Sequence, residues 1–62
     1  MLLKLRGKRV EKGLTQKELA KLIGISLTAY RLKEVGEIEF RTKEINLLLS
    51  ILDCKYEDIF LQ

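Results

Sequence analysis

The chain of 62 residues has no proline, no histidine and only one cysteine. The absence of proline, the strongest helix breaker, favours helix throughout the chain. Because Cys54 is the single thiol, no internal disulfide can form, and no cluster of cysteine and histidine is present to bind zinc. Such a chain is typical of a reducing compartment. It is not typical of an enzyme, since it also lacks a glycine-rich phosphate loop and is too small to enclose a pocket.

Long apolar segments are absent as well. The longest apolar stretch, residues 45–52, is interrupted by Asn46 and Ser50 and is too short to span a bilayer. The first four residues, Met-Leu-Leu-Lys, lack the order and length of a signal peptide. We therefore expect a soluble cytoplasmic protein that uses no membrane, metal, cofactor or small-molecule ligand.

What the chain does contain is apolar and charged residues in quantity. Hydrophobic residues make up 47% of it, enough for one small core, and we expect a single domain over residues 1–62. The net charge of +3 hides a polarity, because residues 1–33 hold nine basic and two acidic residues while residues 34–62 hold three and seven. The halves are therefore near +7 and −4. A positive end attracts polyanions such as DNA, although solvated helix faces are an alternative explanation.

Helix start and stop signals alternate near the middle of the chain. Thr15 and Glu18 have the spacing of a capping box, which starts a helix. Gly24 suits the left-handed backbone just past a helix end, and Ser26 offers a second N-cap directly after it. These signals predict two short helices with only a tight turn between them.

The two predicted helices cover residues 16–23 and about 27–35. Helices joined by so tight a turn cross at a steep angle, and small Ala20 allows their close approach. The second helix is left protruding, which is the geometry for inserting a helix into the major groove of DNA.

The flanking segments predict three further short helices. One covers residues 2–12, one runs from Thr42, as its cap, to about residue 52, and a last one follows residue 55 with Tyr56 facing inward. The predicted fold is an all-α bundle of five short helices. Its expected core residues are Leu19, Leu22, Ile25, Tyr30, Ile45, Leu48, Leu52, Ile59 and Phe60.

Several of these residues together carry a resemblance to a known family. They are Gly13-Leu14-Thr15-Gln16-Lys17-Glu18-Leu19-Ala20, Gly24-Ile25-Ser26, Tyr30, Glu34, Gly36 and the closing segment 52–60. In this order and spacing, from about Leu2 to Phe60, the chain resembles the lambda-repressor-like, Cro-type helix-turn-helix regulators. The resemblance implies double-stranded DNA as partner, with the protruding helix as the recognition helix.

The candidate base-reading residues lie near the start of the recognition helix. They are Leu27, Thr28, Arg31 and Leu32. Thr28 can hydrogen-bond a base or contact a thymine methyl, whereas the two leucines can only contact methyls or exclude water. Arg31 is the one long donor and can reach guanine or a phosphate, unless it is simply an exposed helix side chain.

Backbone contacts and one ion pair follow from the resemblance. It implies that Gln16, at a helix N-terminus, binds a DNA phosphate, and Lys17 and Ser26 are similar candidates. It also places Arg9 and Glu34 as a partly buried ion pair that is structural rather than DNA-reading.

The chain departs from the family pattern after the recognition helix. Glu37 and Glu39 follow where relatives commonly carry polar or basic residues, and Lys33 lies where many have an aliphatic residue, so its stem is expected over the core edge. Leucines also replace amides at the base-reading positions. We therefore expect modest, A·T-leaning specificity that depends on dimerisation, with a homodimer surface formed by Tyr56, Ile59, Phe60 and Leu61.

Two functions fit these features. The first is a sequence-specific transcriptional regulator, a small repressor-like protein of a bacterium or phage that binds an operator as a dimer. The alternative is a protein-interaction module, antitoxin-like or partner-binding, that keeps the fold with weak or no DNA binding. The apolar outward residues Leu27, Leu32 and Val35 and the acidic loop favour the second.

Overall fold

The computed structural model describes residues 1–61, in which every regular element is helical. The elements are α1 (Leu3–Glu11), α2 (Gln16–Ile23), α3 (Leu27–Val35), α4 (Thr42–Leu52) and the 3-10 helix η1 (Tyr56–Asp58). The predicted all-α class is confirmed. The fifth predicted helix is a single 3-10 turn of three residues, too short to form an α-helix.

The ends of α2 and α3 are set by the residues that cap them. The Thr15 hydroxyl accepts a hydrogen bond from the Glu18 amide at 3.0 Å, and the Thr15 amide donates to the Glu18 carboxylate at the same distance. The Ser26 hydroxyl accepts from the Ala29 amide at 3.1 Å and starts α3. Both helices end at a left-handed glycine, Gly24 with φ of 80° and Gly36 with φ of 90°.

The start of α4 differs from the sequence-based expectation. Thr42 is the first helical residue and not the cap, because the N-cap position belongs to Arg41. The Glu44 carboxylate accepts a hydrogen bond from the Arg41 amide at 3.0 Å, so an acidic side chain of the first helical turn satisfies the amide of the N-cap residue.

The core is built by residues from all four α-helices and the segments after α3 and η1. Its buried members are Leu5, Leu19, Ala20, Ile23, Tyr30, Phe40, Leu48, Leu52 and Ile59. Leu22 was expected here but is 53% exposed, because the apolar residues of α2 span more of the helix circumference than the core covers. Ile25, Ile45 and Phe60 lie only partly buried at its edge, and Tyr56, expected to face inward, is 47% exposed.

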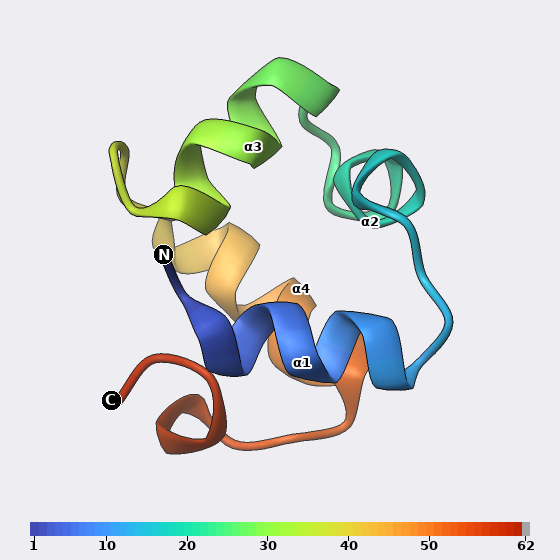
Figure 1. Ribbon diagram of the computed structural model, residues 1–62, viewed down its shortest axis with the longest axis vertical. Helices are drawn as coiled ribbons and strands as arrows, with labels where there is room; N and C mark the ends of the chain where they lie inside the picture. Colours follow the sequence, from blue (N-terminus) through green and yellow to red (C-terminus); the bar gives the residue numbers. More distant parts are fainter. Residues whose placement is uncertain (62) are drawn as a thin grey trace.

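The helices α2 and α3 cross steeply. Figure 1 shows α2 nearly end-on while α3 runs across the picture. The chain start lies beside the end of α3, because the Leu2 amide donates to the Glu34 carbonyl at 2.8 Å. None of the helices within residues 1–61 is both long and apolar enough to cross a membrane.

Candidate nucleic-acid interface

The turn between α2 and α3 brings their backbones close together. Ala20 is almost fully buried there, and the Ile25 amide donates to the Ala20 carbonyl at 3.0 Å. The small side chain lets α3 pack across the end of α2, while the remaining face of α3 stays on the surface of the molecule. The pair therefore presents a helix that can enter a groove.

The predicted base-reading residues divide into two kinds in the structure. Thr28 and Arg31 are exposed, whereas Leu27 and Leu32 are half-buried. A half-buried leucine can still offer its outer atoms to a thymine methyl, but only the exposed pair reaches freely from the surface. The polar contacts available along this face of α3 therefore depend on Thr28 and Arg31.

The predicted phosphate-binding residues lie at the N-termini of α2 and α3. Lys17 and Ser26 are exposed. The Ser26 hydroxyl oxygen already caps α3, which leaves its O–H proton free to donate. The free amide groups at a helix N-terminus favour an anion, so both helix starts suit a backbone phosphate.

Gln16 makes two side-chain contacts that the sequence did not reveal. Its amide nitrogen donates to the Glu34 carboxylate at 3.0 Å, and its amide oxygen accepts from Arg31 Nε at 3.4 Å. A side-chain amide has two N–H donors, so one remains for a phosphate. The first residue of α2 is thereby connected to the middle and the end of α3.

Glu34 is the centre of a buried polar cluster, here called the Glu34 cluster (Arg9, Gln16, Tyr30 and Glu34). The Glu34 side chain is 1% exposed. Its carboxylate accepts hydrogen bonds from Arg9 Nε at 3.0 Å, from Arg9 Nη2 at 3.3 Å and from the Tyr30 hydroxyl. Arg9 Nη1 also donates to the Leu14 carbonyl at 2.9 Å. The cluster joins α1, α2 and α3, and the two-pronged guanidinium contact is the strong form of this ion pair.

The ionisation of the Glu34 cluster follows from these contacts. Burial alone would raise the pKa of Glu34, but hydrogen bonds from Arg9, Tyr30 and Gln16 together outweigh it and hold that pKa below its usual value. Burial, and then the hydrogen bond to Glu34, raise the pKa of Tyr30. Glu34 is therefore a carboxylate at neutral pH, and Tyr30 remains a donor.

A second buried ion pair connects α3 to α4. Lys33 Nζ lies 2.5 Å from Glu44 Oε1, and both residues are at least nine-tenths buried. Burial acts to raise the pKa of Glu44, but the hydrogen bonds from Lys33 and from the Arg41 amide outweigh it and lower that pKa. Lys33 was expected to cover the core edge with its stem. The carboxylate that pairs with Lys33 belongs to α4, and no pattern in the sequence around Lys33 predicts that partner.

These two ion pairs reduce the predicted charge polarity without removing it. Arg9 and Lys33 are 8% and 7% exposed, and each pairs with a carboxylate from the second half of the chain. The first half then keeps seven basic residues against two acids, a net charge of +5, and the second half keeps −2. The seven remaining basic residues are Lys4, Arg6, Lys8, Lys12, Lys17, Lys21 and Arg31.

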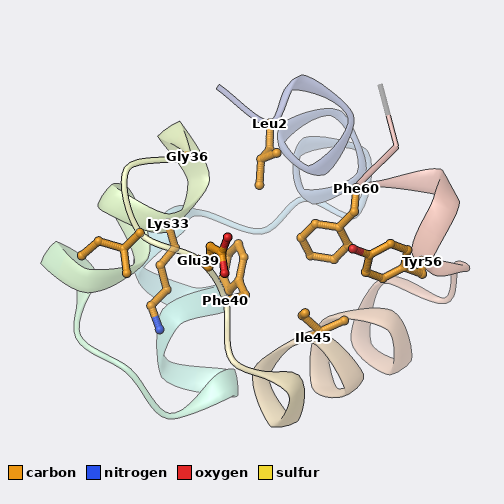
Figure 2. Close-up of a pocket in the computed structure, with 9 residues that line it drawn as sticks. Leu2, Lys33, Gly36, Glu39, Phe40, Ile45, Tyr56 and Phe60 are labelled. Atoms are coloured by element: carbon orange, nitrogen blue, oxygen red, sulfur yellow. The ribbon is translucent and has the colours of Figure 1, made fainter.

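A groove lies between the loop after α3 and the C-terminal segment. Figure 2 shows Gly36 and Glu39 on one side of it and Tyr56 and Phe60 on the other. Its volume is about 310 Å³, and its lining combines apolar side chains with those of Lys33 and Glu39. The ring of Phe60 stacks on that of Tyr56, with centroids 4.8 Å apart. Ile59 was expected both in the core and on the dimer surface, and it is fully buried in the core.

Comparison with known proteins agrees with this geometry. A helix-turn-helix family model matches residues 5–59, nearly the whole chain. No curated protein and no solved structure matches it. The matching family consists of DNA-binding regulators and is not a family of enzymes. From the capped and steeply crossed helix pair and this match, the chain belongs to the Cro/C1-type, lambda-repressor-like helix-turn-helix family.

Proposed function

We propose that the chain is a sequence-specific transcriptional regulator, a small repressor-like protein of a bacterium or phage that occupies an operator in the bacterial cytoplasm. The observation that carries the proposal is the protruding helix α3, on which Thr28 and Arg31 are exposed beside the N-terminus of α2. A helix presented in this way fits the major groove, where each base pair offers its own pattern of donors, acceptors and methyl groups.

Contacts to the DNA backbone would fix the register of α3. The free N–H of Gln16, the ammonium of Lys17 and the hydroxyl of Ser26 lie at the two helix starts and suit phosphate oxygens. Such contacts carry no sequence information and make affinity fall steeply with salt. The net positive charge of the first half supports the same arrangement.

The proposed regulator binds as a homodimer on two half-sites about one helical turn apart. A second copy of the recognition helix is needed because one helix with two exposed polar readers specifies few base pairs. The groove in Figure 2 supports a dimer surface on that side, since Ile38 and Tyr56 in its lining expose apolar area, and Leu61, next to Phe60 in the sequence, is exposed as well.

The experiment that tests the proposal is selection of binding sites from random DNA duplexes, followed by titration of the selected site over a salt series. An enriched palindromic site, bound with a stoichiometry of two chains, is expected. Thr28→Ala is expected to relax specificity, whereas Lys17→Ala is expected to weaken binding to all sequences and to lower the salt slope by about one. No enrichment, with weak binding lost at moderate salt, would contradict the proposal.

The groove also favours a second candidate function, a protein-interaction module. The apolar side chains in its lining, together with Glu39 in the lining and Glu37 nearby in the sequence, suit a partner with an apolar anchor and basic groups. This function predicts that a Tyr56→Glu variant loses a protein partner while its weak affinity for DNA stays unchanged. A regulator that dimerises through the groove instead loses operator binding in the same variant.

A further inference from the structure

The side chain of Arg31 is held through Gln16 by the buried Glu34 cluster. Arg31 Nε donates to the Gln16 amide oxygen at 3.4 Å, and the Gln16 amide nitrogen donates to Glu34 Oε1 at 3.0 Å. Glu34 is itself held by Arg9 and Tyr30. An exposed side chain at the proposed DNA-facing surface is thus connected to a carboxylate that is 1% exposed.

The chemistry of the carboxylate decides which way the amide of Gln16 points. An ionised carboxylate only accepts hydrogen bonds, so it must face the amide nitrogen and not the amide oxygen. The amide oxygen of Gln16 is therefore turned toward Arg31, which has only donors to offer. With the amide reversed, the oxygen would face the Glu34 carboxylate and the nitrogen would face the guanidinium.

The contact uses only the Nε edge of the guanidinium. Within residues 1–61 neither terminal nitrogen of Arg31, Nη1 or Nη2, makes a hydrogen bond, so both can donate to a base. Arginine recognises guanine by donating two hydrogen bonds to O6 and N7, and each terminal nitrogen can supply one. Fixing the Nε edge in advance also removes part of the rotamer entropy that a long side chain loses on binding.

We propose that Gln16 is a positioning residue that orients Arg31 to read a guanine in the operator half-site. The inference rests on the proposed function, because it assigns a specificity to the same DNA-binding surface. The half-site then contains one guanine read by Arg31, next to thymines contacted by Thr28 and the outer atoms of Leu27 and Leu32. In this proposal Gln16 contributes to base specificity through the orientation of Arg31, in addition to any contact with a phosphate.

A double-mutant cycle on DNA tests the reading. Affinity is measured for the selected site and for sites in which each guanine is replaced in turn, with the wild type, Gln16→Ala, Arg31→Ala and the double variant. Arg31→Ala is expected to lose about tenfold discrimination at one guanine. Gln16→Ala is expected to lose most of the same discrimination, and the double variant little more than Arg31→Ala.

The matched control is Lys17→Ala, the next residue of α2, which is exposed. It is expected to lower affinity equally for all the sites. Gln16→Met keeps the length of the side chain and is used beside Gln16→Ala, with a thermal melt of each variant to show that it is folded. If Gln16→Ala and Gln16→Met also lower affinity equally for all the sites, Gln16 is only a phosphate contact and the proposal is overturned.

A measurement without DNA separates this inference from the proposed function. The NMR signal of the Arg31 Nε–H group in the free protein is expected to exchange slowly with water and to speed up in both Gln16 variants, while the signal of exposed Arg6 stays unchanged. An Arg31 signal that is the same in all three proteins would overturn the positioning contact. Failure to select any DNA site would overturn the proposed function and would leave this measurement intact.

Discussion

One carboxylate, that of Glu34, receives hydrogen bonds from side chains of three helices. Arg9 comes from α1, Gln16 from α2 and Tyr30 from α3, which also carries Glu34 itself. A buried carboxylate is stable only when its lone pairs are satisfied in this way. The same residue therefore stabilises the helix packing and orients a side chain at the proposed DNA surface.

Removing Arg9 is expected to destabilise the domain strongly. Arg9→Ala leaves Glu34 buried with its charge uncompensated, and breaking a buried pair from one side costs about 3 kcal/mol of the free energy of unfolding. Urea unfolding measures the change. Arg6→Ala, which removes an exposed arginine from the same helix, is the control and is expected to change stability by less than about 0.5 kcal/mol. Equal stability of the two variants would contradict the expectation.

The residues whose surroundings could be inferred from the sequence are those governed by local chemistry or by the family pattern. Thr15, Glu18 and Ser26 cap helices where their spacing predicts it, since a cap involves only neighbouring residues. The partner of Lys33 could not be inferred, because Glu44 is brought to it only by the packing of two helices. The contacts of Gln16 with Glu34 and Arg31 could not be inferred either, because they depend on the packing of α2 against α3.

At the scale of the elements, replacing a glycine by alanine is expected to have opposite effects on stability inside a helix and at a helix end. Gly7 lies inside α1 and Gly24 ends α2 with φ of 80°, and a Cβ at either position would meet no atom within 4 Å. Gly7→Ala is expected to stabilise the domain by about 0.5–1 kcal/mol by restricting the unfolded chain. Gly24→Ala is expected to destabilise it by about 1 kcal/mol through the left-handed backbone.

Thermal unfolding of the two glycine variants measures these changes. The substitution is the same in both, and the side chain added has open space in both, so a difference of sign isolates the backbone conformation. Destabilisation of equal size in both variants would refute the explanation.

The ion pair between α3 and α4 gives a second prediction at this scale. Lys33→Met is expected to destabilise the domain by about 3 kcal/mol, because Glu44 is then buried without its cation. The double variant Lys33→Met with Glu44→Gln removes both charges and keeps an acceptor for the Arg41 amide. It is expected to be more stable than Lys33→Met alone, as a double-mutant cycle of unfolding free energies will show. Additive losses would mean that the two side chains are not coupled.

Element boundaries were predictable where capping residues mark them. The bounds of α2 and α3, Gln16–Ile23 and Leu27–Val35, follow from a threonine, a serine and two glycines at their ends. The C-terminal segment has no comparable local signal, and three residues of it form a 3-10 turn in place of the helix expected there. The exposed Leu22 shows the limit of helical periodicity, which gives the apolar side of a helix but not the width of the core facing it.

For the whole molecule, the two ion pairs link the basic first half of the chain to the acidic second half. Arg9 and Lys33 belong to the first half, and Glu34 and Glu44 to the second. Both carboxylates have a pKa below the usual value of 4.5 in the folded protein. The folded state therefore binds fewer protons than the unfolded state over the range between the folded and unfolded pKa values.

This difference predicts acid sensitivity of the whole fold. Stability from these carboxylates is fully present above about pH 4.5 and is lost as the pH falls through their folded-state pKa values. Thermal melts over a series of pH values are expected to show a steep fall below about pH 4.5. The Glu44→Gln variant is expected to start less stable at neutral pH and to fall less steeply, because one titrating group is gone. Parallel curves for the two proteins would contradict this assignment.

The backbone contact between the start of the chain and α3 has a consequence for how the molecule can be observed. The amide hydrogen of Leu2 lies before the first helix, yet it is donated to the Glu34 carbonyl near the end of α3. The rate at which this hydrogen exchanges with deuterium therefore reports how often the chain start separates from α3, and it is slower than for an unbonded terminal amide. The exchange protection of the Leu2 amide thus measures the stability of the packing between the chain start and the proposed DNA-reading helix.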